Sequence, residues 1–316
     1  MTQEEFNYML QVAVAEGLPG GSFTMKYSWE EIEALLIGAY TKEETDTLLQ
    51  KKVNQNLLDN PWFTVNQRGV SSYATNGSYG VDRWKCGYAD TVSINDNNEI
   101  TLNGTLGHSA TLEQPMERSL LNLIGKQVTF SFLTTSGDVK SASFTVRDSV
   151  ENYYSVDNEN KEHVCIDTRG NIQTCYVEIS GKSVTIKAIK LELGNVSTLA
   201  SDIPPNYAQE LTKCQRYFQV IPVYSAIGVN VWTTSCEVYY KMPTTMRTIP
   251  SATFPSDLTS IVRELGNVNL TPTSISLNDS GPYLSPEFVS IVIRGSGMKA
   301  GKVYSIGANI PLSADL

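Results

Sequence analysis

Few side chains in this sequence could act as acids, bases or nucleophiles in a recognisable pattern. The two histidines are His108, in the turn-like stretch 106–109, and His163, beside a polar loop. Both are expected to be exposed and to have no catalytic role. Nucleophile-elbow, zinc-protease and phosphate-loop patterns do not occur. The sequence therefore predicts a protein that is not an enzyme.

Carboxylates offer the remaining route to catalysis or metal binding. Two carboxylates about 5 to 9 Å apart can hydrolyse a glycosidic bond. The run 95–99 has oxygen ligands suited to Ca²⁺, but it lacks the spacing of a calcium loop and is interpreted as a polar hairpin turn. We expect neither a metal nor a cofactor. The candidate acids for hydrolysis are Asp90, Asp96, Glu99, Asp157 and Glu159.

The five cysteines do not form a zinc pattern, because no pair has the CxxC spacing and the number is odd. Cys165 and Cys175 flank a predicted hairpin, so a disulfide between them is one possibility. The sequence opens without the basic segment of a secretory signal, which favours synthesis in a cytoplasm. We therefore expect reduced and mostly buried thiols.

Exposed tyrosine and tryptophan side chains are the candidates for binding a glycan, because aromatic rings stack on sugar faces. Tyr153 and Tyr154 are adjacent, so on a strand one of them must face outward. Trp62 and Trp84 are expected in the core. For the other aromatic residues, burial in the core or in a subunit contact is the alternative. The candidate ligand-binding residues are Tyr153, Tyr154, Trp232, Tyr239, Tyr240 and Tyr283.

Composition limits the partners. The chain has 316 residues, of which 41% are hydrophobic, and this length is enough for one large domain or for two to three smaller ones with buried cores. The net charge of −9 disfavours general binding to nucleic acid, which needs clustered lysine and arginine. No apolar run reaches about 18 residues, so membrane insertion is not expected.

The first 55 residues have the pattern of short amphipathic helices. Thr2 and Glu5 form a capping box, and one apolar stripe follows at helical spacing. The stripe ends before Gly17, which is a natural helix stop. Its residues are Phe6, Met9, Leu10, Ala13 and Val14.

A ten-residue unit then occurs twice, at 27–36 and 40–49, each time with its own capping box. Such short helices are marginal alone in water and must pack on something. Three copies around one axis would cover their narrow apolar faces; an intramolecular helical hairpin is the alternative. The predicted oligomerisation residues are Ile32, Leu35, Leu36, Leu48, Leu49 and Val53.

From residue 56 the apolar period changes to two, which predicts β-strands. One hairpin is expected over 128–146 and another over 174–188, and the alternation slips at Ala188, which predicts a bulge. After a connector with a short helical turn near 209–215, strands are expected at 217–224, 228–233, 235–241, 288–294 and 302–312. The predicted fold is mainly β, with short N-terminal helices, an antiparallel, jelly-roll-like β-sandwich and a second C-terminal β domain.

Several segments, in their order along the chain, resemble bacteriophage tail-fibre and head-fibre proteins. Residues 40–49 resemble the stem unit of such fibres. Other segments look like the opening and the closing strand of the carbohydrate-binding-module-like β-sandwich common in them, and like the acidic, leucine-containing chain ending. The segment 220–300 has no such counterpart. The resembling segments beyond the stem are 56–63, 66–69, 82–84, 190–194, 207–211, 214–218 and 311–316.

The resemblance implies a homotrimeric virion fibre that binds a host-surface glycan or protein through non-catalytic contacts. Residues 1–55 are then an attachment and trimerisation stem, whose first helix contacts other virion proteins of the tail, baseplate or capsid. Residues 56–200 are the sandwich, and residues 201–316 are the receptor-binding tip. The expected location is the virion surface, after synthesis in the host cytoplasm. The alternatives are a capsid head fibre or decoration protein docked through its N-terminus, and a small glycan hydrolase or esterase.

Overall fold

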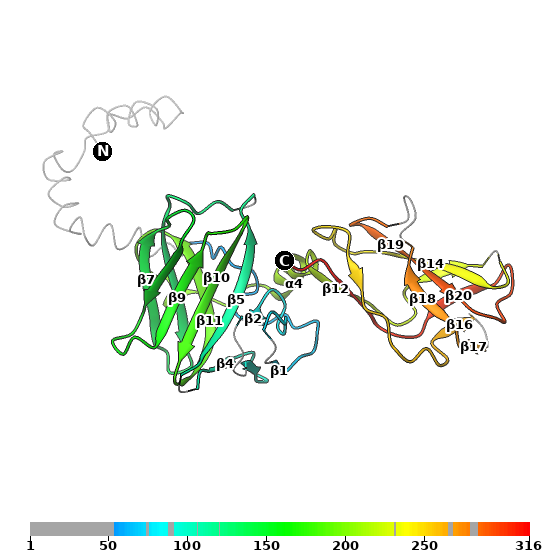
Figure 1. Ribbon diagram of the computed structural model, residues 1–316, viewed down its shortest axis with the longest axis horizontal. Helices are drawn as coiled ribbons and strands as arrows, with labels where there is room; N and C mark the ends of the chain where they lie inside the picture. Colours follow the sequence, from blue (N-terminus) through cyan, green and yellow to red (C-terminus); the bar gives the residue numbers. More distant parts are fainter. Residues whose placement is uncertain are drawn as a thin grey trace, which may run out of the picture. The chain divides into compact units, whose positions relative to one another are not determined.

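The computed structural model describes residues 54–73, 76–87, 92–105, 107–119, 121–230, 232–264, 268–278 and 284–316 (Figure 1). Residues 54–316 form one compact unit that is mainly β, built from antiparallel sheets. The predicted N-terminal helices, with their attachment and oligomerisation residues, lie outside the described residues. The same holds for Asp90 and Tyr283.

Two sheets occupy the first part of this unit. The six-stranded sheet has the order β1 (Ser72–Tyr73), β3 (Val92–Ile94), β4 (Ile100–Asn103), β11 (Ser183–Leu193), β6 (Gln127–Thr134) and β7 (Val139–Thr145). The five-stranded sheet has the order β2 (Lys85–Cys86), β5 (Ser109–Glu117), β10 (Ile172–Ser180), β9 (Glu162–Asp167) and β8 (Glu151–Ser155).

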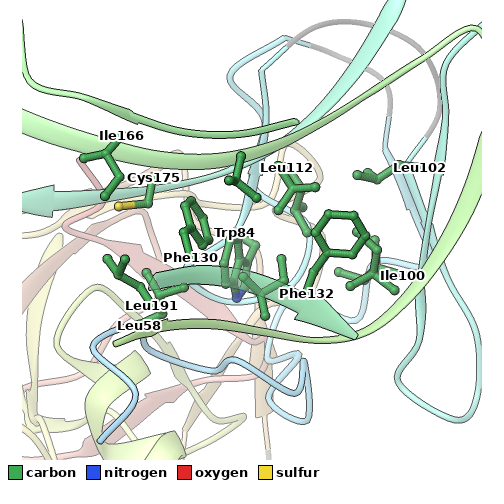
Figure 2. Close-up of a cluster of buried hydrophobic side chains, with 14 of the residues drawn as sticks. Leu58, Trp84, Ile100, Leu102, Leu112, Phe130, Phe132, Ile166, Cys175 and Leu191 are labelled. Carbon is green, nitrogen blue, oxygen red and sulfur yellow. The ribbon is translucent and has the colours of Figure 1, made fainter. Parts of the chain in front are cut away.

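Both sheets contribute to a single hydrophobic cluster (Figure 2). Phe130 and Phe132 come from β6 of the six-stranded sheet, and Leu112 comes from β5 of the five-stranded sheet; all three are fully buried. Trp84, just before β2, is also fully buried, whereas Trp62 is half-buried. The expectation of a core position is therefore confirmed for Trp84 only.

One predicted hairpin is wrong in its pairing. β10 and β11 are both present, but β10 pairs with β5 and β9 while β11 pairs with β4 and β6. The turn at Gly181, whose φ is +63°, thus carries the chain from one sheet to the other. Alternation predicts strands but not their partners. The predicted bulge is confirmed, because the register of β11 shifts between Ile186 and Ala188.

The two cysteines flanking the β9–β10 turn lie on opposite faces of their sheet. Cys175 pairs in register with Ile166, and Cys165 pairs with Tyr176, so the two thiols are offset by one residue. Adjacent positions on paired strands point to opposite faces. All five cysteines of the chain carry buried thiols, as expected.

The connector after β11 is held by a buried ionic cluster. This connector contains a 3₁₀ turn, η1 (Leu199–Ser201), and then the helix α4 (Tyr207–Gln215). Lys190 Nζ lies 2.6 Å from Asp202 Oδ1 and 2.8 Å from Thr198 Oγ1. Glu192 accepts hydrogen bonds from the amide and the hydroxyl of Thr198. The charged residues of the 190–194 motif therefore fasten the connector to the sheet.

The second part of the unit has a three-stranded and a seven-stranded sheet. The first has the order β12 (Phe218–Ile221), β21 (Ile310–Ser313) and β15 (Ser251–Ala252). The second has the order β17 (Val268–Leu270), β16 (Val262–Glu264), β20 (Val303–Ile306), β13 (Ile227–Val229), β14 (Ser235–Lys241), β19 (Phe288–Arg294) and β18 (Ser274–Leu277).

The single strand predicted for 302–312 is two strands in different sheets, β20 and β21. Gly307 lies at the break, and a Cβ there would be 3.1 Å from the Ile261 carbonyl oxygen. The predicted shared face is retained, because Tyr304, Ile306, Ile310 and Leu312 belong to one buried cluster.

Replacing Lys190 with Met should lower the free energy of unfolding by about 3 to 5 kcal/mol, because Glu192 and Asp202 lose their buried cation. The change is measured by urea denaturation. Lys187→Met, at an exposed position of the same strand, is the matched control and should have little effect. Equal stability of the two variants would contradict this role of the cluster.

Candidate functional site

Residues 66–69, 82–84, 214–218 and 311–316 meet at one junction. Arg68 Nη1 lies 2.8 Å from Asp82 Oδ1, and Arg68 also forms an ion pair with Asp315, which lies 247 residues later in the chain. The same guanidinium carbon lies 3.8 Å from the centroid of the Phe218 ring. One cation thus connects the 66–69 and 82–84 segments to β12 and to the residues after β21.

A second buried arginine strengthens the junction. Arg83 has its guanidinium carbon 3.5 Å from the centre of the Tyr217 ring. Its Nε donates to Asp59 Oδ2 at 3.1 Å, and its Nη2 donates to the Pro115 carbonyl at 2.7 Å. Nearby, the Asn60 amide donates to Glu210 Oε2 of α4 at 2.7 Å. These motifs therefore have a structural role in this chain.

A cavity of about 620 Å³ lies beside this junction. Its two guanidinium groups are already occupied, since Arg247 pairs with Glu117 at 2.8 Å and Arg118 pairs with Asp148 at 3.4 Å. The lining offers no cation without a carboxylate partner, so we do not assign a ligand to it. The lining residues are Glu117, Arg118, Ser119, Asn171, Ile172, Arg247 and Leu316.

The outer face of the five-stranded sheet, opposite the core, carries a continuous set of polar and aromatic side chains. The strand registers place Tyr153, Cys165, Tyr176, Glu113 and Lys85 in one row across all five strands. The next row contains Ser155, His163, Glu178 and Thr111, and Ser109 and Ser180 follow beyond Glu178. Together these residues form the outer face of the five-stranded sheet.

Tyr153 gives this face an aromatic surface. It lies on the edge strand β8 and is 41% exposed. One side of its ring stacks on His163, with the centroids 4.4 Å apart. Its hydroxyl donates to Glu178 Oε1 at 3.0 Å. Burial and the Glu178 carboxylate raise the pKa of the Tyr153 hydroxyl, so it stays protonated and remains a donor.

Glu178 is the centre of a hydroxyl cluster on the same face. Its Oε1 also accepts hydrogen bonds from Ser109 at 2.9 Å and from Ser180 at 3.2 Å. The carboxylate is half-buried. A sugar can stack on the exposed ring, and its hydroxyl groups can donate hydrogen bonds to the fixed carboxylate beside that ring.

Glu113 is a second carboxylate on this face, and burial raises its pKa. Lys85 Nζ lies 3.8 Å from its Oε2, and Thr111 donates to its Oε1 at 3.2 Å. Gly87 lies against it, since a Cβ on Gly87 would be 1.6 Å from Glu113 Oε1. The glycine thus leaves the space that this carboxylate fills.

The expectation for His163 is wrong. It lies within β9 and is 5% exposed, whereas the sequence indicated an exposed residue. Its Nε2 contacts Asn160 Oδ1 at 3.1 Å, and its buried Nδ1 has no hydrogen-bond partner among the described residues. The strand begins earlier than the polar run 157–162 indicates. His108 is exposed, as expected.

The predicted ligand-binding aromatics that the structure describes do not gather at one place. Tyr154 is half-buried and stacks on Phe144, with the centroids 4.3 Å apart, so the expected outward and inward placement of Tyr153 and Tyr154 is confirmed. Tyr240 is half-buried against the second core. Trp232 and Tyr239 are exposed, on the β13–β14 hairpin.

The predicted acids that the structure describes are either exposed or held in local contacts. Asn95 closes the 95–99 turn by accepting from the Glu99 amide and donating to the Glu99 carboxylate, which agrees with a polar hairpin turn. Asp157 pairs with Lys182 at 3.0 Å, and the pKa of Asp157 is lowered to about 2 by its hydrogen bonds despite partial burial. Asp96 and Glu159 are exposed. Among the described residues, no group of acids, histidines and cysteines could hold a metal.

Glu178, Glu113 and Ser109 were not among the predicted site residues. The alternation over 172–180 already puts Tyr176 and Glu178 on one face. The alignment with β5 and β8 is not visible in the sequence, because β10 pairs with β5 across tens of residues and is connected to β8 only through β9.

Comparison with known proteins gives no family for this chain, since no family model matches it and no curated protein is significantly similar to it. Within the described part of the chain, no helix has the length and apolar character needed to cross a membrane.

The junction should make stability depend on pH through Asp82. Burial raises the pKa of Asp82 from 3.8 to about 6, although Arg68 and the Gln67 amide oppose this. The folded protein therefore keeps the proton of the Asp82 carboxyl group between about pH 4 and pH 6, whereas the unfolded chain loses it in this range. The stabilisation is fully present below about pH 4 and is lost as the pH rises through about 6.

Asp82→Asn removes this titration. The free energy of unfolding of the native protein, relative to that of the variant, should fall by roughly 2 kcal/mol between pH 4 and pH 7. Urea denaturation of both proteins across this range measures it. Suppose instead that the difference in free energy of unfolding between the two proteins does not change with pH, or grows towards neutral pH. This result would show that Asp82 is ionised throughout.

Proposed function

We propose that this protein is a homotrimeric bacteriophage virion fibre that binds a glycan or protein on the host surface without catalysis. Residues 1–55 form the attachment and trimerisation stem, residues 56–200 the first β domain, and residues 201–316 the tip. The chain is made in the host cytoplasm and then displayed on the virion surface. The buried thiols of all five cysteines agree with synthesis in a reducing compartment.

The first β domain is a carbohydrate-binding-module-like, jelly-roll-like sandwich in this proposal. The support is that the six-stranded and five-stranded sheets fill one hydrophobic cluster from both sides. Several fibre-like segments contact one another at Arg68 and Arg83. These contacts support the family assignment, because they explain physically why the segments occur in this order along one chain.

The proposed binding of a glycan rests on the outer face of the five-stranded sheet. Tyr153 offers an exposed ring held by His163, and Glu178 is oriented by three hydroxyl donors. This combination suits a neutral sugar, whose ring stacks and whose hydroxyl groups donate to the carboxylate. A single shallow face binds weakly. Three copies on one stem raise the avidity through effective concentration.

Tyr153→Ala and Glu178→Gln should each lower binding of the full chain to a glycan array and to host cells by about tenfold, since each loses roughly 1.4 kcal/mol of contact. Tyr207→Ala is the matched control, because Tyr207 is also exposed but lies on α4. Unchanged binding by both face variants would reject this face. Release of reducing ends from host cell wall would instead favour a hydrolase.

Imaging of purified particles labelled on this chain tests the virion assignment. The proposal expects threefold labelled projections on the particle surface. Particles without label would contradict it.

A further inference from the structure

The outer face of the seven-stranded sheet carries three exposed cations. The opposite face is buried in the second core, through residues such as Val238 and Tyr304 (Figure 1). Because side chains alternate along a strand, Arg263 on β16, Lys241 on β14 and Arg294 on β19 point away from that core. All three side chains are exposed, and none of them forms an ion pair with a residue that the structure describes.

One carboxylate lies on the same face. Among the described strand residues that alternation places outward, the acid is Glu237, two residues from Tyr239 on β14. Glu237 is half-buried, and its Oε2 accepts a hydrogen bond from the Tyr239 hydroxyl at 2.8 Å. Three cations and one carboxylate leave this face with an excess of positive charge, although the whole chain has a net charge of −9. An electropositive face on an acidic protein favours an anionic partner.

Two tyrosine rings lie among these cations. Tyr239 and Tyr224 are 44% and 42% exposed. Tyr224 precedes β13 and has a φ of +63°, and its ring packs over Gly307, where a Cβ would be 3.2 Å from Tyr224 Cε1. The guanidinium carbon of Arg263 lies 5.2 Å from the centroid of the Tyr224 ring. Because aromatic rings stack on sugar faces and a guanidinium forms paired hydrogen bonds with a carboxylate, this pair suits an acidic sugar.

The cation on β19 has hydroxyl groups beside it. Strand register places Arg294 between Ser235 of β14 and Ser274 of β18, so the three residues share the outer face. Ser274 is exposed and Ser235 is half-buried. A hydroxyl can both donate and accept a hydrogen bond, so these two serines suit the hydroxyl groups of a sugar whose carboxylate contacts the arginine.

The separation of the cations favours a polymer over a small anion. Lys241 is two residues from Tyr239, or roughly 7 Å along β14. Arg263 lies in the same row as Tyr239 but three strands away, or roughly 14 Å. Arg294 is one strand across and four residues along, also roughly 14 Å. A single small anion reaches one of these cations, whereas a chain with repeated charges reaches all three.

We propose that the outer face of the seven-stranded sheet binds an acidic polysaccharide whose sugar rings carry carboxylates. Tyr224 and Tyr239 stack on the sugars, and Arg263, Lys241 and Arg294 bind the carboxylates. A charge carried by the ring itself fits this face, because the guanidinium of Arg263 lies against the tyrosine ring. The site is separate from the outer face of the five-stranded sheet, and the inference requires neither that face nor a trimer.

Binding of the full chain to immobilised polygalacturonate, alginate and hyaluronate tests the inference, with dextran as the neutral control. The chain should bind at least one acidic polymer and not dextran. Salt at 1 M, which shortens the Debye length to about 3 Å, should weaken this binding at least about tenfold. Arg263→Gln and Tyr239→Ala should each lower the affinity roughly tenfold. Lys187→Gln, at an exposed position of β11, removes a charge elsewhere and is the matched control.

Three results would overturn the inference. The first is an absence of binding to all three acidic polymers. The second is an equal loss of affinity in Arg263→Gln and Lys187→Gln, because binding would then follow the net charge of the chain. The third is equally tight binding of poly(glycerol phosphate) or single-stranded DNA, which have no carboxylated sugar. The glycan face is tested by its own variants, Tyr153→Ala and Glu178→Gln, so the two proposals can fail independently.

Discussion

The structure depends on a guanidinium that two carboxylates share. Arg68 lies between Asp82, on the loop before β2, and Asp315, after the last strand, and its flat side covers Phe218 at the start of β12. Loss of Arg68 would leave two buried carboxylates without their cation, which is strongly destabilising. The junction therefore holds the beginning and the end of residues 54–316 together, and the second pair of sheets is anchored through it.

Other buried charged residues have a related structural role. Arg83 and Glu210 extend the same junction, and Lys190 with Glu192 fastens the connector that leads to it. The outer face of the five-stranded sheet is polar and aromatic around Glu178.

Local pattern predicted much of the fold. β14 and β19 have the expected bounds, and the slip at Ala188 is a bulge, because alternation and turns are properties of neighbouring residues. The crossing between β10 and β11, the burial of His163 and the cluster at Glu178 were not predicted. Each depends on which strands pair over tens of residues, and alternation alone carries no information on that choice. The Arg68 junction joins residues 247 apart and was not predicted either.

A double-mutant cycle between Arg68 and Asp315 tests the junction most directly. The free energy of unfolding is measured for the native chain, for Arg68→Met, for Asp315→Asn and for the double variant. If one cation holds the last residues against the first loops, the two single losses exceed the double loss by about 1 to 3 kcal/mol. Losses that add to within about 0.5 kcal/mol would show that the two residues act independently, and the junction would not be what holds the two β regions together.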